Sequence, residues 1–151
     1  MRTLIALLLL ISLATTAFAG AWGEGSFDND DALDWAAQCT QSNSIEPVRL
    51  ALLAVLDANN YIEAPLGSAA IAAAEVVAAA LGRPSSKLPP IIQSWVHRQP
   101  IEKLSQLAPL ARKALARIQN AKVSELQQLW SEGKPNNWPV VIAELESRLG
   151  K

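Results

Sequence analysis

The sequence has few of the residues that form disulfides, bind metals or act as nucleophiles. Its 151 residues include one cysteine and one histidine. A single cysteine excludes an intramolecular disulfide framework and a multi-cysteine zinc site. The 13 Lys and Arg residues nearly balance the 14 Asp and Glu residues. This balance argues against a generally basic nucleic-acid-binding protein.

The remaining composition is that of a folded protein. Half of the residues are apolar and only 18% are charged, which is too apolar for intrinsic disorder. The length suits one domain, large enough to bury a stable core without disulfides or metal ions.

The first 19 residues have the order of a secretory signal peptide. Arg2 precedes an apolar run, Leu4–Leu13, and Ala17-Phe18-Ala19 has the small-x-small form of a signal-peptidase site. The run is shorter than the roughly 20 residues of a membrane-spanning helix. We predict cleavage after Ala19, and Gly20 at the next position is not the cysteine of a lipoprotein. The sequence therefore predicts a periplasmic or secreted protein, with one helical domain over residues 20–151.

The mature chain shows helical spacing and no strand-like alternation. A first helix is expected from Asn29 or Asp30, with Cys39 on its buried face. A second follows Ser44 and runs to about Asp57; it is apolar on all sides and therefore predicted to be central. A third, alanine-rich core helix spans 68–81, and Gly82 ends it.

Four further signals extend this pattern to the C-terminus. Pro89-Pro90 opens a short helix that holds Trp95. From Ile101 the chain is helical again, with either a kink or a break into two helices at Pro109. Ser124 and Gln127 fit a capping box. A last helix is expected over residues 138–149. Its apolar residues form one face, and Glu144 and Arg148 lie on the opposite face. We predict an all-α, compact single domain of about six or seven short helices.

Charge is unevenly distributed along the chain. Residues 20–75 have a net charge of −8, and residues 76–151 have a net charge of +6. One interpretation is that the two halves pack so that opposite charges lie close together. The other is a basic face that attracts an acidic partner protein. Its candidate residues are Arg98, Lys103, Arg112, Lys113 and Arg117. Nucleic acid is not expected as a partner, because no aromatic residues alternate with these bases.

The most distinctive motif follows the predicted cleavage site. Glycines surround a tryptophan, which indicates a tight turn packed against an aromatic ring, and an Asp-Asn-Asp cluster then begins a helix. The motif residues are Gly20, Trp22, Gly23, Gly25, Phe27, Asn29, Asp30 and Trp35.

These residues resemble, one by one, the N-terminal motif Gly-x-Trp-Gly-x-Gly-x-Phe-x-Asn-Asp of a bacterial family, domain of unknown function 4259. Residues 61–65, 72–82 and 124–130 are similar to its middle and later parts. Many relatives start with Met directly before the glycine, where this chain has a leader instead. The resemblance implies no activity, cofactor or metal.

The polar residues form no recognised catalytic or metal-binding pattern. His97 has no triad pattern around it, and residues 28–31 fail the Asp-x-Asp-x-Asp-Gly calcium loop, because Ala32 and Leu33 follow. No catalytic, cofactor-binding or metal residue is therefore predicted. Glu63 and Glu75 lie in apolar contexts and are the candidates for carboxylate chemistry, although a buried, hydrogen-bonded structural acid is the preferred interpretation of Glu75.

Two functions are consistent with these features. The first is an exported, non-catalytic binding protein, for example of the immunity or inhibitor type. The alternative is a carboxylate-dependent hydrolase acting on cell-envelope glycan or peptidoglycan, which requires Glu63 or Glu75 beside an aromatic residue in a pocket.

Overall fold

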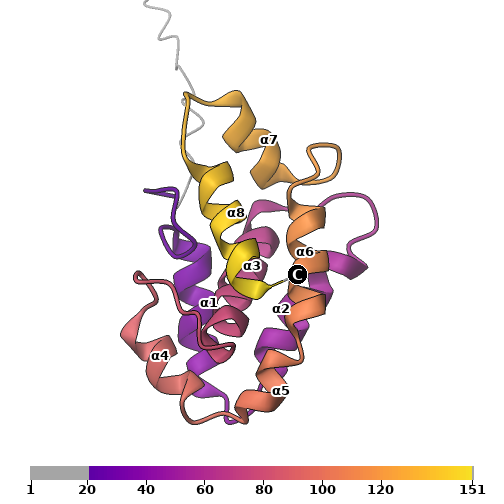
Figure 1. The fold of residues 1–151 in the computed structure, drawn as a ribbon. Coiled ribbons are helices and arrows are strands. Elements are labelled where there is room, and N and C mark those ends of the chain that lie inside the picture. The colour runs from indigo at the N-terminus through magenta and orange to yellow at the C-terminus, as the bar shows by residue number, and fades with distance from the viewer. Residues whose placement is uncertain (1–20, 151) are drawn as a thin grey trace, which may run out of the picture.

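A computed structural model describes residues 21–150, which form an all-α domain (Figure 1). The helices in this range are α1 (Asp30–Gln41), α2 (Glu46–Asp57), α3 (Ala64–Ala80), α4 (Pro90–Val96), α5 (Ile101–Ser105), α6 (Ala108–Ile118), α7 (Glu125–Glu132) and α8 (Trp138–Leu149). The predicted fold class is confirmed. The predicted leader and Gly20 lie outside the described residues.

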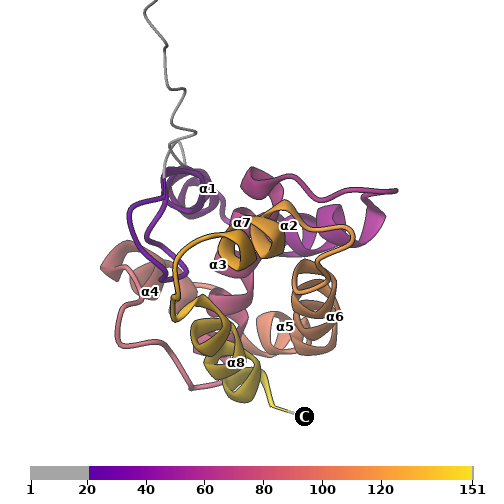
Figure 2. The same cartoon turned by 90° about the horizontal axis from the view of Figure 1, so that it is seen from above.

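Helix α3 is the centre of the fold. It contacts each of the other helices, which surround it when the molecule is seen from above (Figure 2). Its alanines favour helix and let neighbouring helices approach closely. Pro65 occupies its first turn, and Gly82, with φ of 77°, ends it in the left-handed conformation that glycine tolerates. Within residues 21–150, no helix is long and apolar enough to cross a membrane.

Several helix ends lie where local sequence signals predicted them. The Asn29 side chain accepts a hydrogen bond from the backbone N–H of Ala32 and begins α1. Ser124 accepts one from the N–H of Gln127 and begins α7. The reciprocal half of this capping box does not form, because the Gln127 side chain bonds to Ser131 instead.

Two expectations need correction. Helix α2 is not central: Leu50 is 54% exposed, since only one face of this helix packs on α3 and α6. Helix α3 starts four residues earlier than predicted, at Ala64, because Glu125 accepts a hydrogen bond from the backbone N–H of Ala64. Of the two alternatives left open at Pro109, the structure has the break, which gives α5 and α6 as separate helices.

The predicted burial of Cys39 is confirmed, and it has a measurable consequence. Its side chain is fully buried on α1, and loss of solvation raises the pKa of the thiol to about 12. Only about one thiol in 10⁴ would then be ionised at pH 8. We expect no detectable reaction with a thiol reagent at pH 8 in the folded protein, and complete reaction in denaturant. Fast labelling without denaturant would contradict this burial.

Candidate functional site

The N-terminal motif forms a tight loop in front of α1. The backbone N–H groups of Trp22 and Gly23 both donate to the carbonyl oxygen of Asp28, and the N–H of Asp28 donates to the carbonyl of Gly25. The Asp28 carboxylate folds back to accept the N–H of Gly25 at 3.0 Å. A bridge between Ala21 and Asn29 closes the base of the loop. We call residues 21–28 the glycine loop.

Both glycines are required by the close approach of Asp28. A Cβ atom added at Gly23 or at Gly25 would lie 2.6 Å from the Asp28 Oδ2 atom, well inside van der Waals contact. The glycine spacing of the motif is therefore explained by packing of the loop on its own carboxylate.

Substitution of Gly23 by alanine tests this explanation. We expect the free energy of unfolding to fall by about 1–3 kcal/mol, because Asp28 must leave its hydrogen bond to make room. Gly133→Ala is the matched control: its new Cβ would meet nothing closer than a backbone oxygen at 3.6 Å. Urea denaturation compares the two, and equal stability would show that the Asp28 contact is unimportant.

The glycine loop buries one aromatic residue and exposes the other. Phe27 packs into the core, whereas Trp22 is 60% exposed. Trp35, further along α1, is half-buried against the core. The hydrogen bonds of the glycine loop therefore hold a large apolar side chain, that of Trp22, at the surface.

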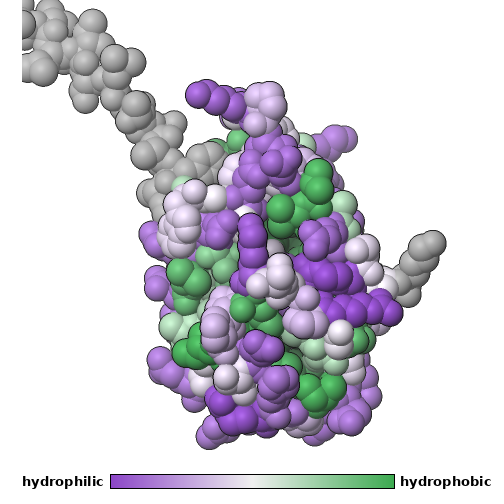
Figure 3. All heavy atoms as spheres, turned by 60° about the vertical axis from the view of Figure 1, so that its left-hand side comes forward, coloured by the Kyte–Doolittle hydropathy of each residue, from purple (hydrophilic) through white to green (hydrophobic). Residues whose placement is uncertain are grey.

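Trp22 stands at the rim of an open groove of about 690 Å³. The groove runs between the glycine loop, the end of α7 and the start of α8. It is lined by Ala21, Trp22, Gly23, Glu24, Gly25, Asp28, Lys87, Trp130, Asn137 and Val141. Trp130 stacks on Trp138, with 6.3 Å between the ring centroids. On the side of the molecule that carries the loop, hydrophobic and hydrophilic surface alternate (Figure 3).

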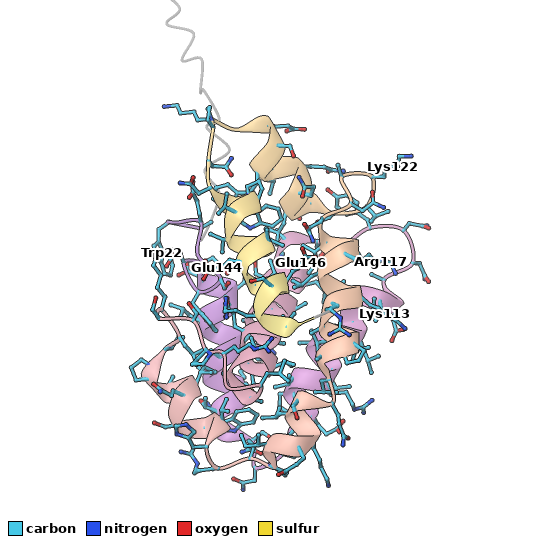
Figure 4. The ribbon with its side chains drawn as sticks, in the orientation of Figure 1. Trp22, Lys113, Arg117, Lys122, Glu144 and Glu146 are labelled. Atoms are coloured by element: carbon cyan, nitrogen blue, oxygen red, sulfur yellow. The ribbon has the colours of Figure 1, made fainter. Side chains whose placement is uncertain are left out.

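A smaller cleft of about 120 Å³ adjoins the groove and shares Gly25, Asp28, Lys87 and Val141 with it. Glu75 lies at its inner end and Glu144 on its α8 side. Figure 4 shows Glu144 on the side of α8 toward Trp22. Glu146 lies on the other side, toward α6, where it accepts a hydrogen bond from Gln119.

Glu75 connects the loop to the last helix. Ser26 donates its hydroxyl to Glu75 Oε1 at 2.7 Å, and Arg148 donates from both terminal nitrogens, at 2.7 and 2.8 Å. Glu75 is only 2% exposed, so the prediction of a buried, hydrogen-bonded acid is confirmed. The hydrogen bond to Glu75 raises the pKa of Arg148. Arg148 was expected opposite the apolar face of α8, beside Glu144, and it does contact Glu144; its side chain is nevertheless only 15% exposed, because it turns inward to the Glu75 carboxylate.

A profile of the family Domain of unknown function (DUF4259) matches residues 20–139 of the chain. The chain belongs to this family. No curated protein and no solved structure matches the chain. The DUF4259 match includes the glycine loop, Lys87 and Trp130, so most of the groove is part of the shared domain. Glu144 and Arg148 on α8 lie beyond the matched residues.

The second carboxylate candidate of this DUF4259 chain lies far from the first. Glu63 is exposed at the N-terminal end of α3, twelve residues before Glu75. At about 1.5 Å per residue, the two are roughly 18 Å apart along the helix. Glycosidase carboxylates stand about 5–10 Å apart. Glu63 and Glu75 are therefore not spaced as the two carboxylates of a glycosidase.

The five basic candidates come from three places in the fold. Arg98 follows α4, Lys103 lies on α5, and the other three lie on α6. Helices α4 and α6 lie on opposite sides of α3 in both views (Figures 1 and 2). The structure therefore groups the α6 residues but separates them from Arg98.

Two of the α6 arginines have structural partners. Arg112 donates to the carbonyl of Leu149 near the end of α8, and Arg117 donates to the carbonyls of Leu56 and Ala58 at the end of α2. These are favourable positions for a cation, because helix C-termini carry partial negative charge. Lys113 between them is exposed. Within residues 21–150, the ion pair between Arg148 and Glu75 is the only one that joins the acidic and the basic halves of the chain.

The structure also locates the histidine and the possible metal ligands that were considered from the sequence. His97 is exposed at the end of α4. Within the described part of the chain, no group of three His, Cys, Asp or Glu residues could hold a metal ion. The sequence did not indicate the contribution of Lys87, Trp130 and Val141 to a groove, because they are distant in the chain and meet only through packing.

Proposed function

We propose that this protein is an exported, non-catalytic binding protein that holds a partner protein in the groove beside the glycine loop. The observation that carries the proposal is Trp22, which is 60% exposed on a loop held by its own hydrogen bonds and by Glu75. Exposed tryptophans on preorganised segments are frequent anchors of protein interfaces, because little entropy is lost when they are buried. An immunity- or inhibitor-type protein is one concrete form of this function.

Export is part of the proposal. The leader over residues 1–19 supports a periplasmic or secreted location, with Gly20 as the new N-terminus. N-terminal sequencing of the protein isolated from the envelope and the medium of its host tests this. A mature chain that begins at Gly20 is the expected result, and an intact Met1 in the cytoplasmic fraction would contradict it.

Affinity capture from the host envelope tests the binding role. The tagged protein, expressed with its own leader, is compared with Trp22→Ala and with Leu50→Ala as a matched control. Leu50 is 54% exposed on α2, far from the groove in sequence and on another element. We expect a stoichiometric partner that Trp22→Ala loses and Leu50→Ala keeps. A partner retained by Trp22→Ala would exclude the groove.

The same capture experiment distinguishes binding at the groove beside Trp22 from binding at the basic surface of α6. Lys113→Glu reverses the exposed charge of α6 without touching the glycine loop. If Lys113→Glu abolishes capture and Trp22→Ala does not, the partner binds the basic α6 surface instead. Repeating the capture at high salt measures the electrostatic contribution, because salt screens exposed charges.

A further inference from the structure

The charge around the groove indicates the chemistry of the partner; this step rests on the proposed function. Glu24 and Asp28 line the groove, and Glu144 lines the cleft that continues it. Glu75 is neutralised by its bidentate contact with Arg148. Arg148 also contacts Glu144 at 3.8 Å. Among the described residues that line these two hollows, four acids therefore stand against two cations, Lys87 and Arg148.

The first turns of α1, which directly follow the glycine loop, add more negative charge. They hold Asp30, Asp31 and Asp34. Partial burial, followed by repulsion from Asp30 and Asp34, raises the pKa of Asp31. The ion pairs found within residues 21–150 include none of the acids of α1 or of the glycine loop. The acids of α1 and of the glycine loop therefore have no ion-pair partner among the described residues.

Trp22 adds an aromatic face to this acidic surface. A lysine or arginine side chain that lies over an indole ring gains a cation–π contact, and its charge is attracted by nearby carboxylates. A phosphate-rich ligand or an acidic segment would meet repulsion from the same carboxylates.

We infer that the groove beside Trp22 binds a basic peptide segment, in which a lysine or arginine side chain packs on the indole and neighbouring cations face Glu24, Asp28 and Glu144. This partner has the opposite charge from the one expected for the α6 surface. The groove beside Trp22 and the basic surface of α6 lie on different elements of the molecule, so binding at each is tested independently.

Selection from a phage-displayed library of random peptides tests the inference without a known partner. The protein expressed with its own leader is immobilised, and the library is depleted on immobilised Trp22→Ala before selection. We expect the enriched peptides to be rich in lysine and arginine, with a net positive charge. Their affinity should fall about tenfold for the double variant Glu24→Gln/Glu144→Gln and should weaken as salt increases.

A control substitution at an acid outside the groove keeps the comparison specific. Glu46→Gln removes an acid on α2 whose carboxylate is paired with Arg49, and it should leave affinity unchanged. Thermal unfolding of each variant checks that the fold is retained.

Three other outcomes would overturn the inference. Peptides that require Trp22 but are neutral or acidic would overturn the charge assignment and leave the proposed function standing. Absence of any peptide that distinguishes the protein from Trp22→Ala would overturn both. A dimer that Trp22→Ala dissociates would show that a second copy of this chain occupies the groove.

Discussion

Replacement of Glu75 by alanine is expected to lower the free energy of unfolding by about 3 kcal/mol, because it leaves a buried cation without its partner. The Arg148 side chain is 15% exposed, and Glu144, its other carboxylate contact, is 3.8 Å away. Folded proteins are stable by only about 5–15 kcal/mol, so this loss is large. Urea denaturation at neutral pH measures it.

Two controls identify the cause. Glu46→Ala breaks an exposed ion pair with Arg49 and should change stability little. The double variant Glu75→Leu/Arg148→Met replaces the buried pair by apolar side chains and should recover most of the lost stability. If Glu75→Ala is as stable as Glu46→Ala, the buried pair does not hold α3 and α8 together.

The same substitution should loosen the glycine loop. Ser26 would lose its acceptor, and the loop is attached to α3 through that hydrogen bond. We expect faster hydrogen exchange at the N–H groups of Trp22 and Gly25, which are bonded within the loop. Glu75→Gln, which keeps an acceptor for Ser26, should show a smaller increase. Unchanged exchange in Glu75→Ala would mean that the loop holds its shape alone.

Truncation of Trp95 to alanine is the second large effect that we expect, about 3–5 kcal/mol of unfolding free energy. Trp95 is fully buried, and its indole N–H donates to the carbonyl of Ser42 at 2.7 Å. Ser42 caps the end of α1, so this one side chain fastens α4 to α1. The loss combines a cavity with the loss of the hydrogen bond to the Ser42 carbonyl, which is part-buried.

A graded series separates these two contributions. Trp95→Phe keeps most of the ring but removes the donor, and it should cost less than Trp95→Ala. Ile91→Ala lies on the same helix at a side chain that is 55% exposed, and it should have little effect on denaturation. Equal effects of Trp95→Ala and Ile91→Ala would place Trp95 outside the cooperative core.

Helix positions were predictable because their signals are local. Asn29, Gly82 and Ser124 act on backbone groups within four residues of themselves, and each ends or begins a helix as expected. The burial of Cys39 followed from helical spacing in the same way. Pro109 left two local solutions open, and packing selected separate helices.

The candidate site was only partly predictable. The glycine motif marked the loop, and an acid within an alanine-rich helix marked Glu75 as unusual. Nothing local indicated that Arg148, 73 residues away, would be its partner. The exposure of Leu50 was missed for the same reason: apolar composition does not tell which side of α2 a neighbour covers.

The sequence by itself determined an all-α chain, several of its helix ends, its leader-like first residues and its membership of a family with a glycine–tryptophan motif. These are properties of short windows, in which capping, spacing and composition act over one or two helical turns. The tertiary structure alone decided that α3 is central, that Ser26, Glu75 and Arg148 meet, and that Trp22 borders a groove with an acidic rim. Those features depend on contacts between distant segments, which are selected by the packing of the whole core.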